Sequence, residues 1–187
     1  MASRTSVIWV TRDEDEDGPL CTALRARGLE VVLDPLVRTI IESDGVEAAS
    51  TLKREHWLVL TSPRSVELVS EMAVHREPRV AVVGETSAHL ARARGFRVKH
   101  VAPSRCAEGV WRYLSREHAG ERICFMRSRK AAMPEGYFSH LDVIDLYDTA
   151  PRQAGADTPS RAMLITLTSG AVVKACVDQF GELPLPA

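Results

Sequence analysis

The sequence predicts an α/β protein whose parallel sheets are covered by helices on both faces, in three layers. Short β-branched runs alternate with amphipathic stretches from one end of the chain to the other. Glycine, proline or serine marks most of the points where one kind of segment gives way to the other. Strands separated by helices run parallel, because each helix returns the chain to the same end of the sheet. A repeated pair of motifs further predicts two domains.

The first elements have clear boundaries. Val7–Thr11 is an apolar, β-branched run and is predicted to be a strand. Pro19–Arg27 is predicted to be a helix, because proline suits the first helical turn and Gly28 follows as a stop. Glu30–Leu33 is the next predicted strand. These three segments form the first strand–helix–strand unit.

The middle of the chain repeats this pattern. Trp57–Thr61 reads as a buried strand, with Ser62 as the N-cap of a helix that starts at Pro63. The strands and helices that follow are Val80–Val83, Thr86–Arg94, Val98–Val101, Cys106–Arg116 and Ile123–Met126. A further strand is expected at Val143–Tyr147, then a strand at Met163–Thr168 and a helix at Ser169–Phe180.

Two short segments recur and indicate a duplicated unit. Leu60-Thr61-Ser62 returns as Leu167-Thr168-Ser169, and Arg25–Gly28 returns as Arg92–Gly95. Chance or shared α/β pattern is the alternative explanation for either match alone. In the middle of the chain the Thr-Ser segment precedes the Arg-Ala-Arg-Gly segment, whereas the copies on the two flanks occur in the reverse order. If each pair of segments belongs to one domain, the middle domain is inserted into the chain of the other. We expect domain 1 at residues 1–36 plus 151–187, domain 2 at 42–143, and two linker strands at 37–41 and 144–150.

Composition excludes several classes of protein. The 187 residues are 45% hydrophobic and 26% charged, which is typical of a globular protein and not of a disordered chain. No apolar run approaches the length of a membrane span, and no secretory signal is recognisable, so a cytoplasmic protein is expected. The four cysteines and six histidines lack metal-site spacing, so no metal site is expected. A net charge of −1 argues against nucleic acid as a partner.

Small polar residues recur where a strand leads into a helix. The pattern occurs at Thr11-Arg12, at Thr61-Ser62, at Gly84 with Thr86, and at Thr168-Ser169. Helix N-termini at this edge offer free backbone N–H groups and partial positive charge, which suit an anionic ligand. The alternative is that each residue is a plain N-cap, worth about 1 kcal/mol to its helix.

Two further candidates follow strands. Arg127 opens a basic run, Arg127-Ser128-Arg129-Lys130, which binds an anion or forms a solvated loop. Tyr147 lies in one predicted linker strand, where its hydroxyl faces either water or a cleft. In a cleft it would donate a proton or a hydrogen bond.

In their order and spacing these segments resemble the uroporphyrinogen-III synthase family of tetrapyrrole biosynthesis. The motifs that match are Val10-Thr11-Arg12, Leu60-Thr61-Ser62-Pro63-Arg64, Val82-Val83-Gly84-Glu85-Thr86, Met126-Arg127, Leu146-Tyr147-Asp148-Thr149 and Leu167-Thr168-Ser169. The resemblance implies two α/β domains joined by a two-stranded linker, with the first domain discontinuous. It also implies a lyase without a cofactor. This lyase would close hydroxymethylbilane, a small anionic molecule with eight carboxylates, into uroporphyrinogen III with inversion of ring D and loss of water.

The resemblance makes Tyr147 the candidate for assisting departure of the substrate's hydroxyl. Together with the strand-end pattern it predicts a set of substrate-binding residues: Thr11, Arg12, Thr61, Ser62, Arg64, Gly84, Thr86, Arg127, Thr168 and Ser169.

The family continues beyond the position of Ala187 with another strand and a Gly-x-x-Thr helix. From this difference we expect an incomplete first domain, self-association through it, and weak or absent activity. Two other functions are therefore considered: an inactive or partner-dependent relic that acts as an interaction module, and a phosphate-binding regulator.

Overall fold

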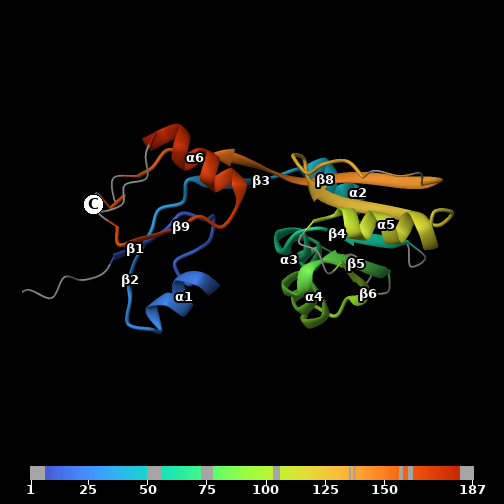
Figure 1. The fold of residues 1–187 in the computed structure, drawn as a ribbon, viewed down its shortest axis with the longest axis horizontal. Coiled ribbons are helices and arrows are strands. Elements are labelled where there is room, and N and C mark those ends of the chain that lie inside the picture. The colour runs from blue at the N-terminus through green and yellow to red at the C-terminus, as the bar shows by residue number, and fades with distance from the viewer. Residues whose placement is uncertain are drawn as a thin grey trace, which may run out of the picture. The chain divides into compact units, whose positions relative to one another are not determined.

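The described part of the chain forms nine strands and six helices, and they alternate except where β2 leads directly to β3 and β7 to β8 and β9 (Figure 1). The computed structural model describes residues 7–49, 56–72, 78–102, 106–134, 136, 138–155, 158–159 and 162–181. The strands are β1 (Val7–Val10), β2 (Glu30–Leu33), β3 (Val37–Ile41), β4 (Trp57–Leu60), β5 (Arg79–Val83), β6 (Arg97–Ala102), β7 (Arg122–Ser128), β8 (His140–Pro151) and β9 (Leu164–Thr166). The helices are α1 (Pro19–Arg25), α2 (Ser43–Ala49), α3 (Pro63–Glu71), α4 (Gly84–Ala93), α5 (Glu108–Glu117) and α6 (Gly170–Phe180). The predicted α/β class is confirmed.

The chain divides into two compact units. Unit 1 comprises Met1–Ile40 and Thr149–Ala187, and unit 2 comprises Ile41–Asp148. Unit 1 contains a three-stranded sheet of order β2-β1-β9, in which both pairings are parallel. Its core includes Trp9, Leu36 and Cys176, and the ring of Phe180 stands at 86° to that of Trp9.

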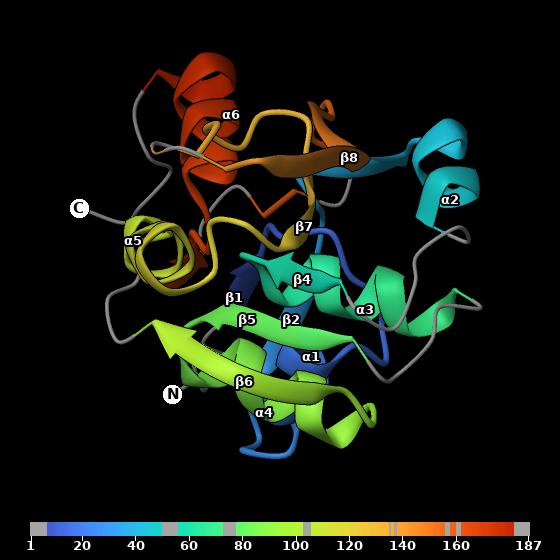
Figure 2. The same cartoon turned by 90° about the vertical axis from the view of Figure 1, so that its right-hand side faces the viewer.

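The larger sheet has the order β3-β8-β7-β4-β5-β6. From β8 to β6 every pairing is parallel. Figure 2 shows β4, β5 and β6 side by side. At the β3 edge of this sheet, the Arg152 N–H donates to the Leu36 carbonyl and the Glu42 N–H donates to the Leu146 carbonyl. The partner numbers run in opposite directions, so β3 is antiparallel to β8.

Strand β4 shows how the two faces of this sheet are covered. Leu58 and Leu60 belong to one core with the apolar side chains of α3 and α4. Trp57 and Val59 belong to a second core with those of α5. Successive side chains of a strand point to opposite faces, so α5 covers one face while α3 and α4 cover the other (Figure 1). Both faces are apolar, as buried parallel strands require.

Several predicted boundaries shift by a few residues. Helix α1 ends at Arg25, before the predicted Arg27, and β8 spans twelve residues where five were expected. Helix α2 was not predicted at all. Among the described residues, no helix is long and apolar enough to cross a membrane.

Candidate functional site

Two polar residues follow the carboxyl end of β4, and their side chains point to opposite sides of the sheet. Thr61 continues the alternation of Trp57 and Val59, and it lines a pocket beside α5. Ser62 is the N-cap of α3, and its Oγ accepts the Ser65 N–H at 3.0 Å. The predicted cap is therefore confirmed. The same oxygen also contacts another hydroxyl, that of Tyr147.

Tyr147 is brought to Ser62 by an irregularity in β8. The Tyr147 hydroxyl lies 3.1 Å from Ser62 Oγ, and the residue is 7% exposed. Arg127 pairs with Asp145, but the next residue of β7 pairs with Tyr147, so β8 contains one extra residue, Leu146. Such a bulge reverses which face the following side chain points to. Tyr147 thus joins the core of α3 and α4.

Arg127 is nearly buried and holds the segment that follows β7. Its side chain is 12% exposed, and its Nε donates to Asp145 Oδ1 at 2.8 Å. Its Nη1 donates to the Ala131 carbonyl. The next arginine, Arg129, donates its backbone N–H to the Tyr147 carbonyl at 2.8 Å and pairs its side chain with Glu42. These cations are therefore already paired with carboxylates of the protein.

The other predicted residues of unit 2 lie at helix starts. Gly84 has a φ of +74°, a left-handed conformation that favours glycine, and it opens α4 directly after β5. Thr86 is exposed in the first turn of that helix. Arg64 is exposed in α3, where its Nη1 lies 3.2 Å from Glu67 Oε2.

Four predicted residues belong to unit 1. Thr11 is fully buried, and its hydroxyl donates to the Thr166 carbonyl, so it ties β1 to β9. The Arg12 Nε lies 3.2 Å from Glu14 Oε2. Thr168 and Ser169 are exposed, and Ser169 Oγ accepts the Val172 N–H at 3.3 Å as the N-cap of α6.

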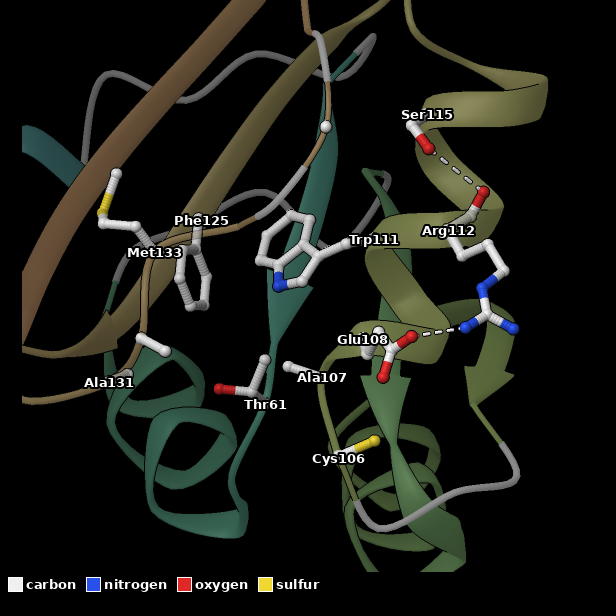
Figure 3. Close-up of a pocket in the computed structure, with 12 residues that line it drawn as sticks. Thr61, Cys106, Ala107, Glu108, Trp111, Arg112, Ser115, Phe125, Ala131 and Met133 are labelled. Carbon is white, nitrogen blue, oxygen red and sulfur yellow. Dashed lines mark hydrogen bonds and ion pairs between the residues drawn. The ribbon is translucent and has the colours of Figure 1, made fainter.

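A pocket of about 510 Å³ lies beside α5 in unit 2 (Figure 3). The rings of Trp111 and Phe125 form one wall, with their centroids 4.7 Å apart, and Thr61 lies below them. The remaining lining residues are Cys106, Ala107, Glu108, Arg112, Ser115, Ala131, Ala132, Met133 and Gly136. Of the residues that line the pocket, Thr61 alone was among the predicted substrate-binding residues. The helical spacing of Glu108, Trp111, Arg112 and Ser115 is the sequence signal that could have identified them.

The buried thiols do not provide a nucleophile at neutral pH. Burial, reinforced by the nearby Asp142, raises the pKa of Cys124 to about 12. Burial and a hydrogen bond with Glu14 raise the pKa of Cys21 to about 11. Within the described ranges, no group of three His, Cys, Asp or Glu residues could hold a metal ion. The polar side chains described at this edge offer hydrogen bonding, proton donation and the placement of charge.

The fold and this edge define a class: α/β proteins with polar side chains at the carboxyl ends of parallel strands, where such proteins bind ligands. Comparison with known proteins identifies the family within this class. The model of the uroporphyrinogen-III synthase HemD family matches residues 19–185. The chain therefore belongs to the uroporphyrinogen-III synthase family.

A curated sequence relative and two solved structures are similar to parts of this chain. A uroporphyrinogen-III synthase of Synechococcus elongatus is 27% identical over 130 residues, which cover 64% of this chain and 49% of the relative. The chain thus spans about half the length of this curated relative. The uroporphyrinogen-III synthetase structure from Helicobacter pylori superposes with a TM-score of 0.56 at 11% identity, covering 96% of this chain and 81% of that one. A mutant uroporphyrinogen III synthase from Thermus thermophilus gives a TM-score of 0.49 at 14% identity, covering 79% and 64%.

Proposed function

We propose that this chain is a uroporphyrinogen-III synthase, a lyase of porphyrin and heme biosynthesis. It would close hydroxymethylbilane into uroporphyrinogen III, with inversion of ring D and loss of water. The observation that carries the proposal is the family match over residues 19–185. The shared order of strand-end motifs and the tyrosine at the carboxyl edge of the sheet support it.

In the proposed reaction Tyr147 donates a proton to the hydroxyl that leaves the bilane as water. The azafulvene that remains is attacked by the substituted carbon of ring D, which gives a spiro intermediate. The original bond between that carbon and the methylene of ring C then breaks, and the free α-carbon of ring D bonds to this methylene and loses its proton. The proton lost when the macrocycle is completed returns to the tyrosine oxygen, so the protein ends unchanged and one water has been released. Ser62 would orient the tyrosine, because its Oγ lies 3.1 Å from that hydroxyl. Holding the bilane in the geometry for this attack is the larger part of the task.

The carboxylates of the substrate need donors that are placed in advance. In unit 2 we assign this role to Thr61, Ser62, Arg64, Gly84, Thr86 and Arg127. In unit 1 we assign it to Thr11, Arg12, Thr168 and Ser169. The structural support for these assignments differs from residue to residue. Thr86, Thr168 and Ser169 are exposed and can reach a ligand, whereas Thr11 is buried and bonded within the sheet.

We further propose domain 1 at residues 1–36 plus 151–187, domain 2 at 42–143 and linker strands at 37–41 and 144–150. The division into two units and the pairing of β3 with β8 support these limits. A cytoplasmic location and the absence of a nucleic-acid partner belong to the same proposal. Self-association through unit 1 is supported by exposed apolar residues of and around β9 and α6, namely Met163, Leu164, Val173 and Val177.

The direct test is conversion of hydroxymethylbilane by the purified chain. The products are oxidised to uroporphyrins and their isomers are separated by chromatography. Formation of the ring-D-inverted isomer supports the proposal. Formation of the uninverted isomer alone, at the rate seen without protein, would reject it and leave a role as an interaction module.

A further inference from the structure

One side of α5 forms a wall of the pocket beside Thr61. Glu108, Trp111, Arg112 and Ser115 follow one another at i, i+3, i+4 and i+7, so they share one helical face. The face is mixed, because an aromatic ring lies between a carboxylate, a guanidinium and a hydroxyl (Figure 3). Apolar walls with a few placed polar groups are typical of small-molecule sites, and about 510 Å³ falls within the range of such pockets, roughly 300–1,000 Å³.

The apolar part of the pocket suits a flat ring. Trp111 and Phe125 meet edge to face, with an interplanar angle of 75°. Trp111 is 4% exposed and Phe125 is 1% exposed, so both rings are fixed by the core behind them. Met133, at the opposite rim, is 55% exposed. A planar aromatic guest would cover this side chain and would meet the small part of the two rings that the core leaves exposed.

The polar part of the pocket suits a carboxylate. Arg112 Nη2 pairs with Glu108 Oε1, and the two side chains are 75% and 64% exposed. An ion pair this exposed contributes little, so the guanidinium can exchange Glu108 for a carboxylate of a ligand. The same pocket reaches the N-terminus of α5, where Ala107 provides no side-chain cap. The positive end of the helix dipole favours negative charge at that position.

The pocket also adjoins the residues assigned to the reaction. Thr61 lines it, and the next residue, Ser62, contacts the Tyr147 hydroxyl at 3.1 Å on the other side of the strand. A ligand held in the pocket would therefore contact the residue next to Ser62, the hydrogen-bond partner of the proposed proton donor.

We propose that this pocket binds one pyrrole ring of the linear tetrapyrrole, with the ring against Trp111 and Phe125 and a ring carboxylate on Arg112. Glu108, released from Arg112, accepts the pyrrole N–H. The inference rests on the proposed function and adds a ring-binding site to it.

Three variants test the pocket through KM for hydroxymethylbilane. Arg112→Ala should raise KM about tenfold, because a charge-assisted hydrogen bond is lost. Glu108→Gln should lower KM severalfold, because it frees Arg112 and keeps a side-chain oxygen that can accept the pyrrole N–H. Ala132→Trp fills the pocket and should raise KM at least tenfold. The matched controls are Ala132→Ser and Arg116→Ala; Arg116 is an exposed arginine of α5 that does not line the pocket.

A second readout separates this inference from the proposed function. Porphobilinogen, a single pyrrole with acetate and propionate groups, is titrated into the full chain by calorimetry. Binding that is weakened by Arg112→Ala and Ala132→Trp, but not by the controls, supports the pocket even if the chain does not convert hydroxymethylbilane. An active chain whose KM and porphobilinogen binding are unchanged in both variants would overturn the pocket and leave the function standing.

Discussion

The direction of Tyr147 depends on one extra residue in β8. Leu141 and Val143 pack toward α5, and regular alternation would send residue 147 to the same face. The bulge at Leu146 turns the tyrosine to the opposite face, where Ser62 lies. Bulges often re-aim a functional side chain in this way. The irregularity is compatible with the role proposed for the tyrosine.

Tyr147→Phe removes the hydroxyl and leaves the ring in the core. Turnover should fall about 10- to 100-fold with little loss of stability, because general acid assistance typically contributes about 10²–10⁴ and the azafulvene forms readily. The measurement is kcat together with a thermal unfolding curve. Tyr113→Phe is the matched control, since its hydroxyl bonds to His118 Nε2 at 3.0 Å and, among the hydrogen bonds described, to no residue of the proposed site. Equal rates for Tyr147→Phe and the parent would remove the acid role.

We expect His100 to make unit 2 less stable in mild acid. Its ring stacks on Tyr113 with centroids 3.9 Å apart, and burial lowers its pKa below the usual 6.5, with a smaller contribution from His118. Below a pH of about 6.5 the unfolded chain binds this proton more readily than the folded protein does, so the free energy of unfolding decreases as the pH falls. The decrease ends when His100 also becomes protonated in the folded protein.

The matching experiment compares urea unfolding at pH 7.5 and pH 5.5. His100→Phe should keep the stacking and lose less stability between the two pH values than the parent does. His89→Gln is the control, because that side chain is 78% exposed. If His100→Phe and the parent lost the same free energy, desolvation of His100 would not be the cause.

At the scale of elements, local chemistry predicts most boundaries. Ser62 and Ser169 are readable as N-caps because serine is strongly preferred directly before a helix, and both accept the expected N–H. Helix α2 is not readable, because Gly45 weakens its propensity and its support comes from a distant strand. The bulge of β8 and the pairing of Arg127 with Asp145 likewise depend on a partner strand that sequence periodicity does not identify.

Gly45 is where α2 meets β8. A Cβ at this position would lie 2.0 Å from the Asp145 carbonyl oxygen, which is backbone and cannot move aside alone. Gly45→Ala should therefore destabilise the protein by about 1–3 kcal/mol, the usual cost of overpacking. Gly120→Ala, with nothing within 4 Å of its added Cβ, should stay within about 0.5 kcal/mol. Denaturant unfolding measures both, and equal stabilities would refute the close packing of α2 on β8.

At the scale of the whole molecule, the two units differ in how much core they contain. Unit 2 has two apolar cores on the faces of its sheet, whereas one cluster of seven buried residues is described in unit 1. The sheet of unit 1 also ends at a β9 of three residues, with Leu164 48% exposed. Less buried apolar area means less free energy to oppose local opening.

Limited proteolysis should therefore cut unit 1 first. Mass spectrometry of the fragments is expected to show both termini trimmed and a resistant core near residues 42–143, within unit 2. Because cleavage follows local opening, urea at a concentration below the main transition should accelerate loss of the termini more than loss of the core. A resistant fragment that retains β1 and α6 would contradict this order of stability.

The isomer produced from hydroxymethylbilane tests the proposed function most directly. Closure without the protein joins the ends of the bilane with ring D unturned, so only a site that holds the chain for attack at the substituted carbon gives the inverted product. We predict that the full chain yields uroporphyrinogen III in excess, and that Tyr147→Phe yields it more slowly. A product that is entirely the uninverted isomer, formed at the same rate with and without protein, would contradict the assignment.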